Sequence, residues 1–284
     1  MQRLILVLFW LTIVVCLNGT VGAEEKPFAM IVMDPLAGPL SCPCVEGYAQ
    51  RKYEVLAAHL KKSLGREVQL VFAQALRVGL KEADARVDLI IGKDSVVRSD
   101  AAGAKLDVIA LAQLTDKNGS TEQNGLIVVN RLDPAQSTKD LDGYTIIFGP
   151  SEASEKHSAA LALLESANVT IPKSLQINEA CSDGACKVID LGPKSKTAAV
   201  ISSYAQPLLE GCGTIKKGDL RVVGQTASVP FISAFCNATL SAKDQSQLKQ
   251  ALIAVKEDSD LLDALESLVG FHPYSEPGGE KKKR

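Results

Sequence analysis

The fold is decided by residues 53–72, whose sequence is YEVLAAHLKKSLGREVQLVF. The first part places Leu56 and Leu60 on one face of a helix, and Gly65 follows where a helix C-terminal cap belongs. The second part, residues 68–72, has the apolar and β-branched content that is typical of a strand. A helix followed closely by a strand is the unit from which α/β sheets are built.

The same alternation continues on both sides of this stretch. We expect strands at residues 28–33, 68–72, 87–91, 108–112, 126–129, 144–148, 197–201, 220–223 and 231–235. We expect helices at residues 53–64, 75–83, 137–141, 154–166, 202–209, 242–256 and 260–268. Because strands that alternate with helices usually pair in parallel, the pattern predicts an α/β fold with mainly parallel sheets.

The composition is that of an ordinary globular protein. Of the 284 residues, 46% are hydrophobic and 23% are charged, which argues against a disordered, collagenous or coiled-coil chain. There are 31 basic and 33 acidic residues, with a formal net charge of −2. The basic excess by which nucleic-acid-binding proteins neutralise phosphates is missing. We therefore expect no nucleic acid as a partner.

The two ends of the chain have distinctive compositions. An apolar run at residues 4–17, followed by small residues at 21–23, predicts that residues 1–23 are a secretory signal peptide. The run is shorter than the roughly 20 residues that cross a bilayer, so we expect no stable membrane insertion after cleavage, with an uncleaved anchor as the alternative. The glycines and charge run of residues 277–284 predict a disordered tail.

Four stretches, taken in order, carry a resemblance to a known family. The first joins a Tyr-x-x-Leu helix to a Leu-Gly-x-x-Val turn at residues 53–68, and the second is the strand and loop at residues 88–92. The third is a strand with a Ser-rich loop at residues 141–154, and the fourth is a late strand with Thr and Pro at residues 220–230. Together they resemble the phosphonate-binding-like (phosphate, phosphite or phosphonate) family of type 2 periplasmic solute-binding proteins, the substrate-capture components of ABC transporters.

The resemblance implies an α/β, two-lobed type 2 periplasmic-binding-protein fold, in which each lobe is a mainly parallel sheet flanked by helices and two crossing strands join the lobes. Lobe one would comprise residues 28–125 plus 230–272, and lobe two residues 126–229. The resemblance also implies location in the periplasm. A small polar ligand, an oxyanion such as phosphonate or phosphate, would be held between lobes that close by hinge motion and passed to an ABC transporter permease.

The sequence contains no enzyme signature of the Gly-x-Ser-x-Gly, Walker or His-Glu-x-x-His kind. We therefore expect a binding protein without catalytic activity and without a cofactor.

The Ser-rich loop is the predicted anion site. The hydroxyls of Ser151 and Ser154, with the free amides at the start of the following helix, would form an anion cradle. Glu152 and Glu155 depart from this pattern, because their carboxylates repel an anion. Simple helix capping by either serine is the alternative. His157 lies one turn further on and would supply an imidazole to the same cleft, unless it is a surface helix residue.

Other ligand-binding candidates follow the ends of strands. By analogy with the family, these cleft-facing residues are Tyr53, Lys93, Asp94, Ser95, Ser203, Tyr204 and Thr226. The two tyrosines would offer hydroxyls or ring faces, and simple packing in the core is the alternative for each.

The cysteines indicate an alternative function. Cys42 and Cys44 flank a proline, a spacing that lets two thiolates approach one soft metal ion such as Cu(I). They would make the chain a metal-binding or thiol-redox accessory protein that reuses the fold, unless they bridge to distant cysteines. Cys181 and Cys186 bound a predicted tight loop, which a local disulfide between them would close.

Overall fold

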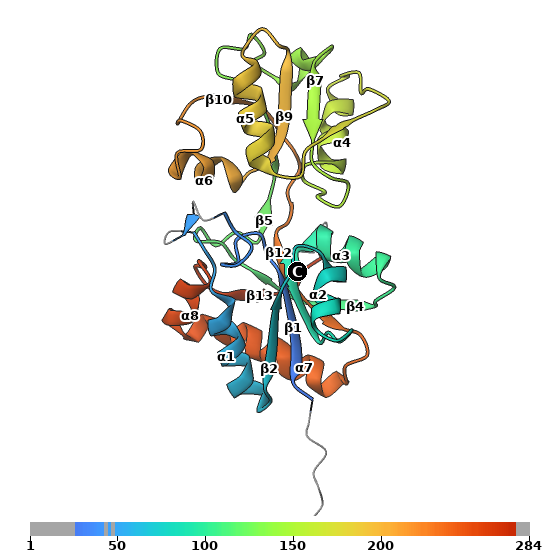
Figure 1. Ribbon diagram of the computed structural model, residues 1–284, viewed down its shortest axis with the longest axis vertical. Coiled ribbons are helices and arrows are strands. Elements are labelled where there is room, and N and C mark those ends of the chain that lie inside the picture. Colours follow the sequence, from blue (N-terminus) through green and yellow to red (C-terminus); the bar gives the residue numbers. More distant parts are fainter. Residues whose placement is uncertain (1–25, 43–44, 47–48, 277–284) are drawn as a thin grey trace, which may run out of the picture.

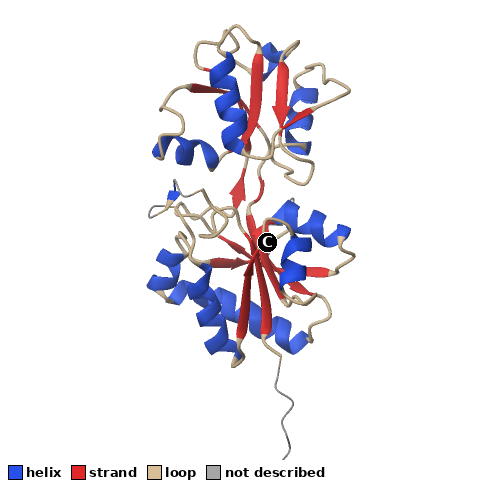
Figure 2. Ribbon diagram, viewed as in Figure 1, coloured by secondary structure: helices blue, strands red, loops and turns tan. Residues whose placement is uncertain are grey.

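The computed structural model describes residues 26–42, 45–46 and 49–276, and shows two lobes along the long axis of the molecule (Figure 1). Each lobe is a sheet with helices on both sides (Figure 2). This arrangement confirms the predicted α/β, two-lobed fold. The expected signal peptide, Cys44 and the expected tail lie outside the described residues.

The helix and strand that decide the fold are found at the predicted residues. Helix α1 spans Tyr53–Leu64 and strand β2 spans Val68–Phe72. Gly65 ends the helix with a left-handed φ of 66°, and its N–H donates to the carbonyl of Lys61. Glycine adopts this conformation with the least strain, and the chain turns from here into β2.

The sheet of the first lobe has six strands in the order β13-β4-β12-β3-β1-β2. The strands are β1 (Phe28–Met33), β2, β3 (Leu89–Lys93), β4 (Val108–Leu114), β12 (Ile232–Asn237) and β13 (Phe271–Pro273). The helices are α1, α2 (Leu76–Glu82), α3 (Asp94–Gly103), α7 (Ala242–Ala254), the 3-10 helix η3 (Val255–Glu257) and α8 (Ser259–Ala264).

Strand β1 is buried on both faces, which explains its continuous apolar sequence. Met30 and Val32 belong to one hydrophobic cluster and Ile31 and Met33 to the other. Alternate side chains of one strand therefore anchor the helices on opposite sides of the sheet.

The sheet of the second lobe has five strands in the order β10-β6-β9-β7-β8. The strands are β6 (Gly125–Asn130), β7 (Thr145–Phe148), β8 (Gln176–Ile177), β9 (Thr197–Ser202) and β10 (Leu220–Gln225). The helices are the 3-10 helix η2 (Thr138–Leu141), α4 (Ser158–Ser166), α5 (Cys181–Leu191) and α6 (Ala205–Gly211). Hydrophobic clusters again lie on both faces of the sheet.

Two crossing segments join the lobes. Strand β5 (Glu122–Gln123) pairs antiparallel with β11 (Val229–Pro230) in a separate two-stranded sheet, seen between the lobes in Figure 1. Next to it, the Thr226 hydroxyl accepts from the Gly125 N–H at 2.7 Å, and the Thr226 N–H donates to the Gly125 carbonyl at 2.9 Å. The two crossing segments are therefore bonded to each other. We retain residues 28–125 plus 230–272 and residues 126–229 as the proposed lobes.

Both large sheets are mixed: most strands of each run in one direction, as predicted, and a minority run against them. β1 is parallel to β2 and β3, but β12 is antiparallel to β3 and β4. In the second lobe, β6 is antiparallel to β9 and β10. β12 and β6 each follow a crossing segment, so they run away from the junction of the lobes, opposite to the strands of the strand-helix repeats.

None of the helices in the described part of the chain is long and apolar enough to cross a membrane.

Candidate functional site

A pocket of about 490 Å³ lies between the two lobes. On the side of the first lobe it is lined by the loop after β1, by Gln74 after β2 and by Lys93 at the end of β3. On the other side it is lined by the loop after β7, the start of α5 and helix α6. Loops at the carboxyl ends of strands are where open α/β sheets bind ligands, and the volume suits a small molecule.

Lys93 reaches across the pocket to the second lobe. Its ammonium forms an ion pair with the carboxylate of Glu155, whose side chain is completely buried. The Ser202 hydroxyl donates to the same carboxylate oxygen at 2.6 Å. Burial opposes ionisation of Glu155, but the charge of Lys93 and the hydrogen bonds from Lys93 and Ser202 outweigh it and hold the pKa of Glu155 below its ordinary value. Lys93 therefore already has an internal counter-ion.

Lys156, the next residue, is a buried cation of a different kind. It is 5% exposed and lines the pocket, and its Nζ donates to the backbone carbonyl of Glu179 at 2.9 Å. Within the described part of the chain, no carboxylate forms an ion pair with it. An ammonium has three donors, so two are left for other partners. A buried charge without a counter-ion is costly, and an anion in the pocket would relieve that cost.

The position of Lys156 depends on Gly149. A Cβ atom at residue 149 would lie 2.5 Å from the Cβ and 2.6 Å from the Cε of Lys156. The lysine side chain therefore packs directly on the glycine backbone, which lets its ammonium reach the pocket.

Tyr204 provides an aromatic wall of the pocket. Its ring stacks on Phe231 with 4.8 Å between centroids and 24° between planes. The guanidinium of Arg51 lies 5.5 Å from the centroid of Phe231. Burial raises the pKa of the Tyr204 hydroxyl well above its ordinary value, and the acidic groups of Cys181, Glu155 and Asp34 add to the shift. The hydroxyl is thus a hydrogen-bond donor at neutral pH.

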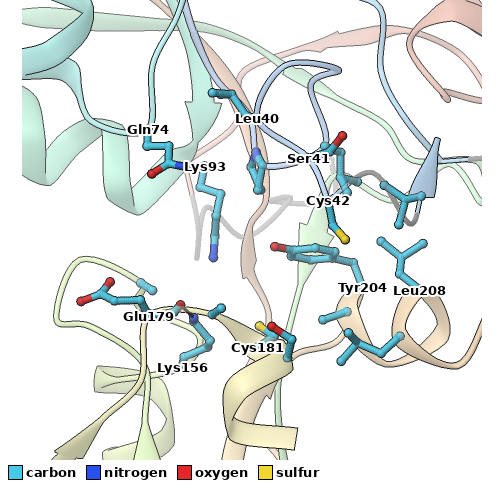
Figure 3. Close-up of a pocket in the computed structure, with 18 of the residues that line it drawn as sticks. Leu40, Ser41, Cys42, Gln74, Lys93, Lys156, Glu179, Cys181, Tyr204 and Leu208 are labelled. Carbon is cyan, nitrogen blue, oxygen red and sulfur yellow. Dashed lines mark hydrogen bonds between the residues drawn. The ribbon is translucent and has the colours of Figure 1, made fainter. Parts of the chain in front are cut away.

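Of the predicted ligand-binding residues, Lys93 and Tyr204 line this pocket. Figure 3 shows Lys93 extending from the first lobe toward Lys156, and Tyr204 lying further along the pocket. Tyr53 instead lies in the core of the first lobe, where it is 0% exposed and its hydroxyl donates to the Asp34 carboxylate at 2.6 Å. Asp94 begins α3 and accepts from Arg98 at 2.8 Å.

Ser95 and Ser154 meet across the lobes. The Ser95 hydroxyl donates to the carbonyl of Glu152 at 2.7 Å and accepts from the N–H of Ser154 at 3.2 Å. One amide of the predicted anion cradle is therefore used by a side chain of the first lobe. The hydroxyl of Ser151 is exposed and donates to the Glu152 carboxylate at 3.2 Å.

The other three predicted ligand-binding residues, His157, Ser203 and Thr226, form hydrogen bonds with backbone groups. The His157 Nδ1 lies 2.8 Å from the carbonyl of Gly149. The Ser203 hydroxyl accepts from the N–H of Asn124 at 3.1 Å, and Thr226 bonds to the other crossing segment as described above. These three residues do not line the pocket between the lobes.

The structure corrects the prediction for Cys181 and Cys186. They lie in helix α5 rather than in a tight loop, and they form no disulfide. Asp183 and Gly184 favour a turn locally. Burial of Ala185 and Val188 in the cluster beneath α5 stabilises the helix instead.

Three of the cysteines in the described segments, Cys42, Cys181 and Cys212, line the pocket. In the same segments, no group of three or more His, Cys, Asp and Glu side chains is arranged to hold a metal ion. The predicted pair of Cys42 and Cys44 stays a prediction, because Cys44 lies outside them.

The sequence interpretation missed Lys156, Gln74 and Leu208, which also line the pocket. The sequence did contain an indication for Lys156, because this residue lies two positions beyond Ser154 in the loop that was predicted as an anion site. No feature of the sequence indicated that Leu208 lines a pocket, because an apolar residue on a short helix is usually part of a core.

Comparison with known proteins finds a family and several solved structures that match most of this chain. Residues 47–277 match the family described as ABC transporter, phosphonate, periplasmic substrate-binding protein. No curated protein matches the chain.

Several solved structures share the fold. A binding-protein component of an ABC phosphonate transporter from Pseudomonas aeruginosa is 15% identical, with a TM-score of 0.65 over 88% of this chain and 82% of that one. PhnD1 of Prochlorococcus marinus in complex with methylphosphonate is 15% identical, with a TM-score of 0.63 over 88% and 93% of the two chains. A Xanthomonas citri protein bound to ATP is 16% identical, with a TM-score of 0.63 over 87% and 91%.

Proposed function

The chain belongs to the phosphonate family of periplasmic substrate-binding proteins of ABC transporters, and on this basis we propose that it is exported to the periplasm and captures a small oxyanion between its lobes. Members of this family bind solutes for transport rather than catalyse reactions. Phosphonate and phosphate are the first candidate ligands, because PhnD1 holds methylphosphonate in the same fold.

Lys156 is the observation that carries this proposal. Its ammonium is buried at the pocket, has a backbone carbonyl as its partner and lacks a carboxylate counter-ion among the described residues. An oxyanion would accept charge-assisted hydrogen bonds from the two remaining donors. Lys93 contributes positive potential, although Glu155 balances most of it. The free donors of Lys156, rather than an overall positive charge of the pocket, would therefore hold the head group, because Glu152 and Glu179 also line the pocket.

Capture would use the junction of the lobes as a hinge. The lobes are connected by two short segments, and Lys93 and Ser95 already bond to the loop after β7. A ligand that bonds to Lys156 in the second lobe and to groups of the first lobe would stabilise the closed arrangement further. The closed form would then be the one that an ABC transporter permease recognises.

Isothermal titration calorimetry with inorganic phosphate and methylphosphonate tests the proposal. We expect saturable binding by the purified protein and at least about a tenfold loss of affinity in Lys156→Met, which removes the charge and keeps most of the side-chain volume. Lys61→Met, at an exposed helix position, is the matched control. Failure of the wild-type protein to bind either anion, or unchanged affinity of Lys156→Met, would contradict the proposal.

A second candidate is the thiol-based function, and one observation favours it. Cys42, Cys181 and Cys212 come from different elements and line the same pocket. Thiolates are ligands for soft metal ions, but these three sulfurs are not gathered into one metal-binding group in this structure, so binding would require them to come together. The test is titration with Cu(I) in a competing chelator, where this function predicts one ion per chain and loss of binding in the Cys181→Ser, Cys212→Ser double variant. Absence of metal binding in the wild-type protein would exclude it.

A further inference from the structure

The two ends of the pocket differ in chemistry. In Figure 3, Gln74, Lys93, Lys156 and Glu179 lie toward one end, and Cys42, Tyr204 and Leu208 lie toward the other. The first end therefore carries the charged groups. At the second end the lining is dominated by an aromatic ring and aliphatic side chains.

The apolar end is built by both lobes. Helix α6 of the second lobe contributes Leu208, and the loop after β1 of the first lobe contributes Cys42. The same helix and loop also line the pocket with Leu209, Leu36, Leu40 and Val45. Val45 and Leu209 are buried, whereas Leu208 is half-buried and its side chain lines the open space. An apolar surface that faces a pocket from both sides is a binding surface for an apolar group.

Tyr204 makes this end rigid. Stacking on Phe231 holds the ring in place, and Phe231 immediately precedes β12 in the central part of the first sheet. The ring therefore offers a preformed flat contact, which binds an apolar group at little entropic cost.

The size of the pocket also favours a ligand that is larger than a bare oxyanion. Its volume of about 490 Å³ is in the range that encloses ligands of drug-like size. A bare oxyanion at Lys156 would leave the space beside Tyr204 and Leu208 to water.

Resting on the proposed function, we propose that the ligand is an organic oxyanion with a sizeable apolar substituent, such as an aryl or medium-chain alkyl phosphonate or phosphate monoester. The oxyanion binds at Lys156, near Lys93. The substituent lies against the Tyr204 ring and the aliphatic side chain of Leu208. Leu208 and Tyr204 then determine specificity, and Lys156 provides the common anchor.

Calorimetry with a graded series of ligands tests this inference: inorganic phosphate, methylphosphonate, hexylphosphonate and phenylphosphonate. Because each buried methylene strengthens binding about fourfold, we expect hexylphosphonate and phenylphosphonate to bind at least about tenfold more tightly than methylphosphonate. Equal affinities, or tighter binding of methylphosphonate, would overturn the inference and leave the proposed function standing. Failure of all four anions to bind would overturn the proposed function and the inference with it.

The variant Leu208→Asp tests whether the end of the pocket at Tyr204 and Leu208 binds the apolar substituent. We expect the ratio of the hexylphosphonate and methylphosphonate affinities to fall at least about fivefold in this variant, because a carboxylate replaces the apolar wall. Leu191→Asp is the matched control, since Leu191 is 52% exposed and does not line the pocket, so the wild-type ratio is expected there. A wild-type ratio in Leu208→Asp would overturn the assignment.

Discussion

Two buried ionic networks in the described part of the chain differ in how completely their polar groups are satisfied. In the first lobe, the Asp34 carboxylate accepts from Arg51 at 2.8 Å, from the Tyr53 hydroxyl at 2.6 Å and from the Leu36 N–H at 2.9 Å. In the second network, Lys93 and Ser202 bond to one oxygen of Glu155, and the other oxygen has no partner within the described structure.

The first network is confined to one lobe, and the second is shared between the lobes. Asp34, Arg51 and Tyr53 are each at most 2% exposed and do not depend on the second lobe. Burial and the charge of Asp34 raise the pKa of Tyr53 well above its ordinary value, so its hydroxyl remains a donor. The Asp34 carboxylate is thus fully satisfied by groups of one lobe. The Glu155 carboxylate at the junction keeps one oxygen without a partner among the described residues, and the neighbouring Lys156 has donors left for a ligand.

Breaking the first network is expected to have the largest effect. Arg51→Met leaves the Asp34 carboxylate buried without its cation, and the free energy of unfolding should fall by about 3–5 kcal/mol. Urea denaturation measures this change. The control is Lys61→Met, which removes an exposed ion pair with Glu67 and should cost less than about 1 kcal/mol. Similar losses in the two variants would show that Arg51 is not part of a buried network.

Adding a side-chain atom at the junction of the lobes should have the next largest effect on stability. A Cβ atom at residue 125 would lie 2.0 Å from the carbonyl oxygen of Glu155, so Gly125→Ala must displace the loop that also carries Lys156. We expect a loss of about 1–3 kcal/mol in the free energy of unfolding and weaker anion binding in calorimetry. Gly103→Ala, where a Cβ atom at the end of helix α3 would meet nothing within 4 Å, should not lower the free energy of unfolding and should leave anion binding unchanged. Wild-type binding by Gly125→Ala would contradict this account.

The pH dependence of stability distinguishes Glu155 from other carboxylates. Its pKa in the folded protein lies below the ordinary 4.5. Ionised Glu155 therefore stabilises the protein above about pH 4.5, and this contribution is lost as the pH falls through the lower folded pKa. We expect the difference in unfolding free energy between the wild-type protein and Glu155→Gln to be largest at neutral pH and to shrink in acid. Denaturation at pH 7 and pH 3 measures it, and a constant difference would argue against the ion pair.

The smallest effect is expected for the neutral contact between the lobes. Ser95→Ala removes the hydrogen bonds to Glu152 and Ser154 and should cost about 0.5–1.5 kcal/mol. Ser151→Ala removes only a solvent-exposed hydrogen bond to the carboxylate of the adjacent Glu152 and should cost less. Small-angle scattering should show a more open average shape for Ser95→Ala alone. An equally open Ser151→Ala would weaken the comparison.

The elements that the sequence predicts well are those with a strong local pattern. The apolar run of β1 and the periodic helix α1 with its glycine cap lie at the predicted residues. Helices α3 and α5 were missed, because their polar faces and turn-forming residues weaken the helical period. Contact with the sheets outweighs that local preference, as the burial of Val97 and Ala185 shows.

The sequence by itself determined the α/β class and the order of most elements, since these follow from interactions over a few residues, and it indicated the loop after β7 on which the anion site is proposed. Tertiary structure alone decided which polar residues face the pocket. Lys93 meets Glu155 across 62 positions of the chain, Tyr53 turns into the core, and Lys156 is left without a carboxylate partner among the residues that the structure describes. No local pattern encodes such pairings, because they arise only when two separately folded sheets are brought together by the crossing segments.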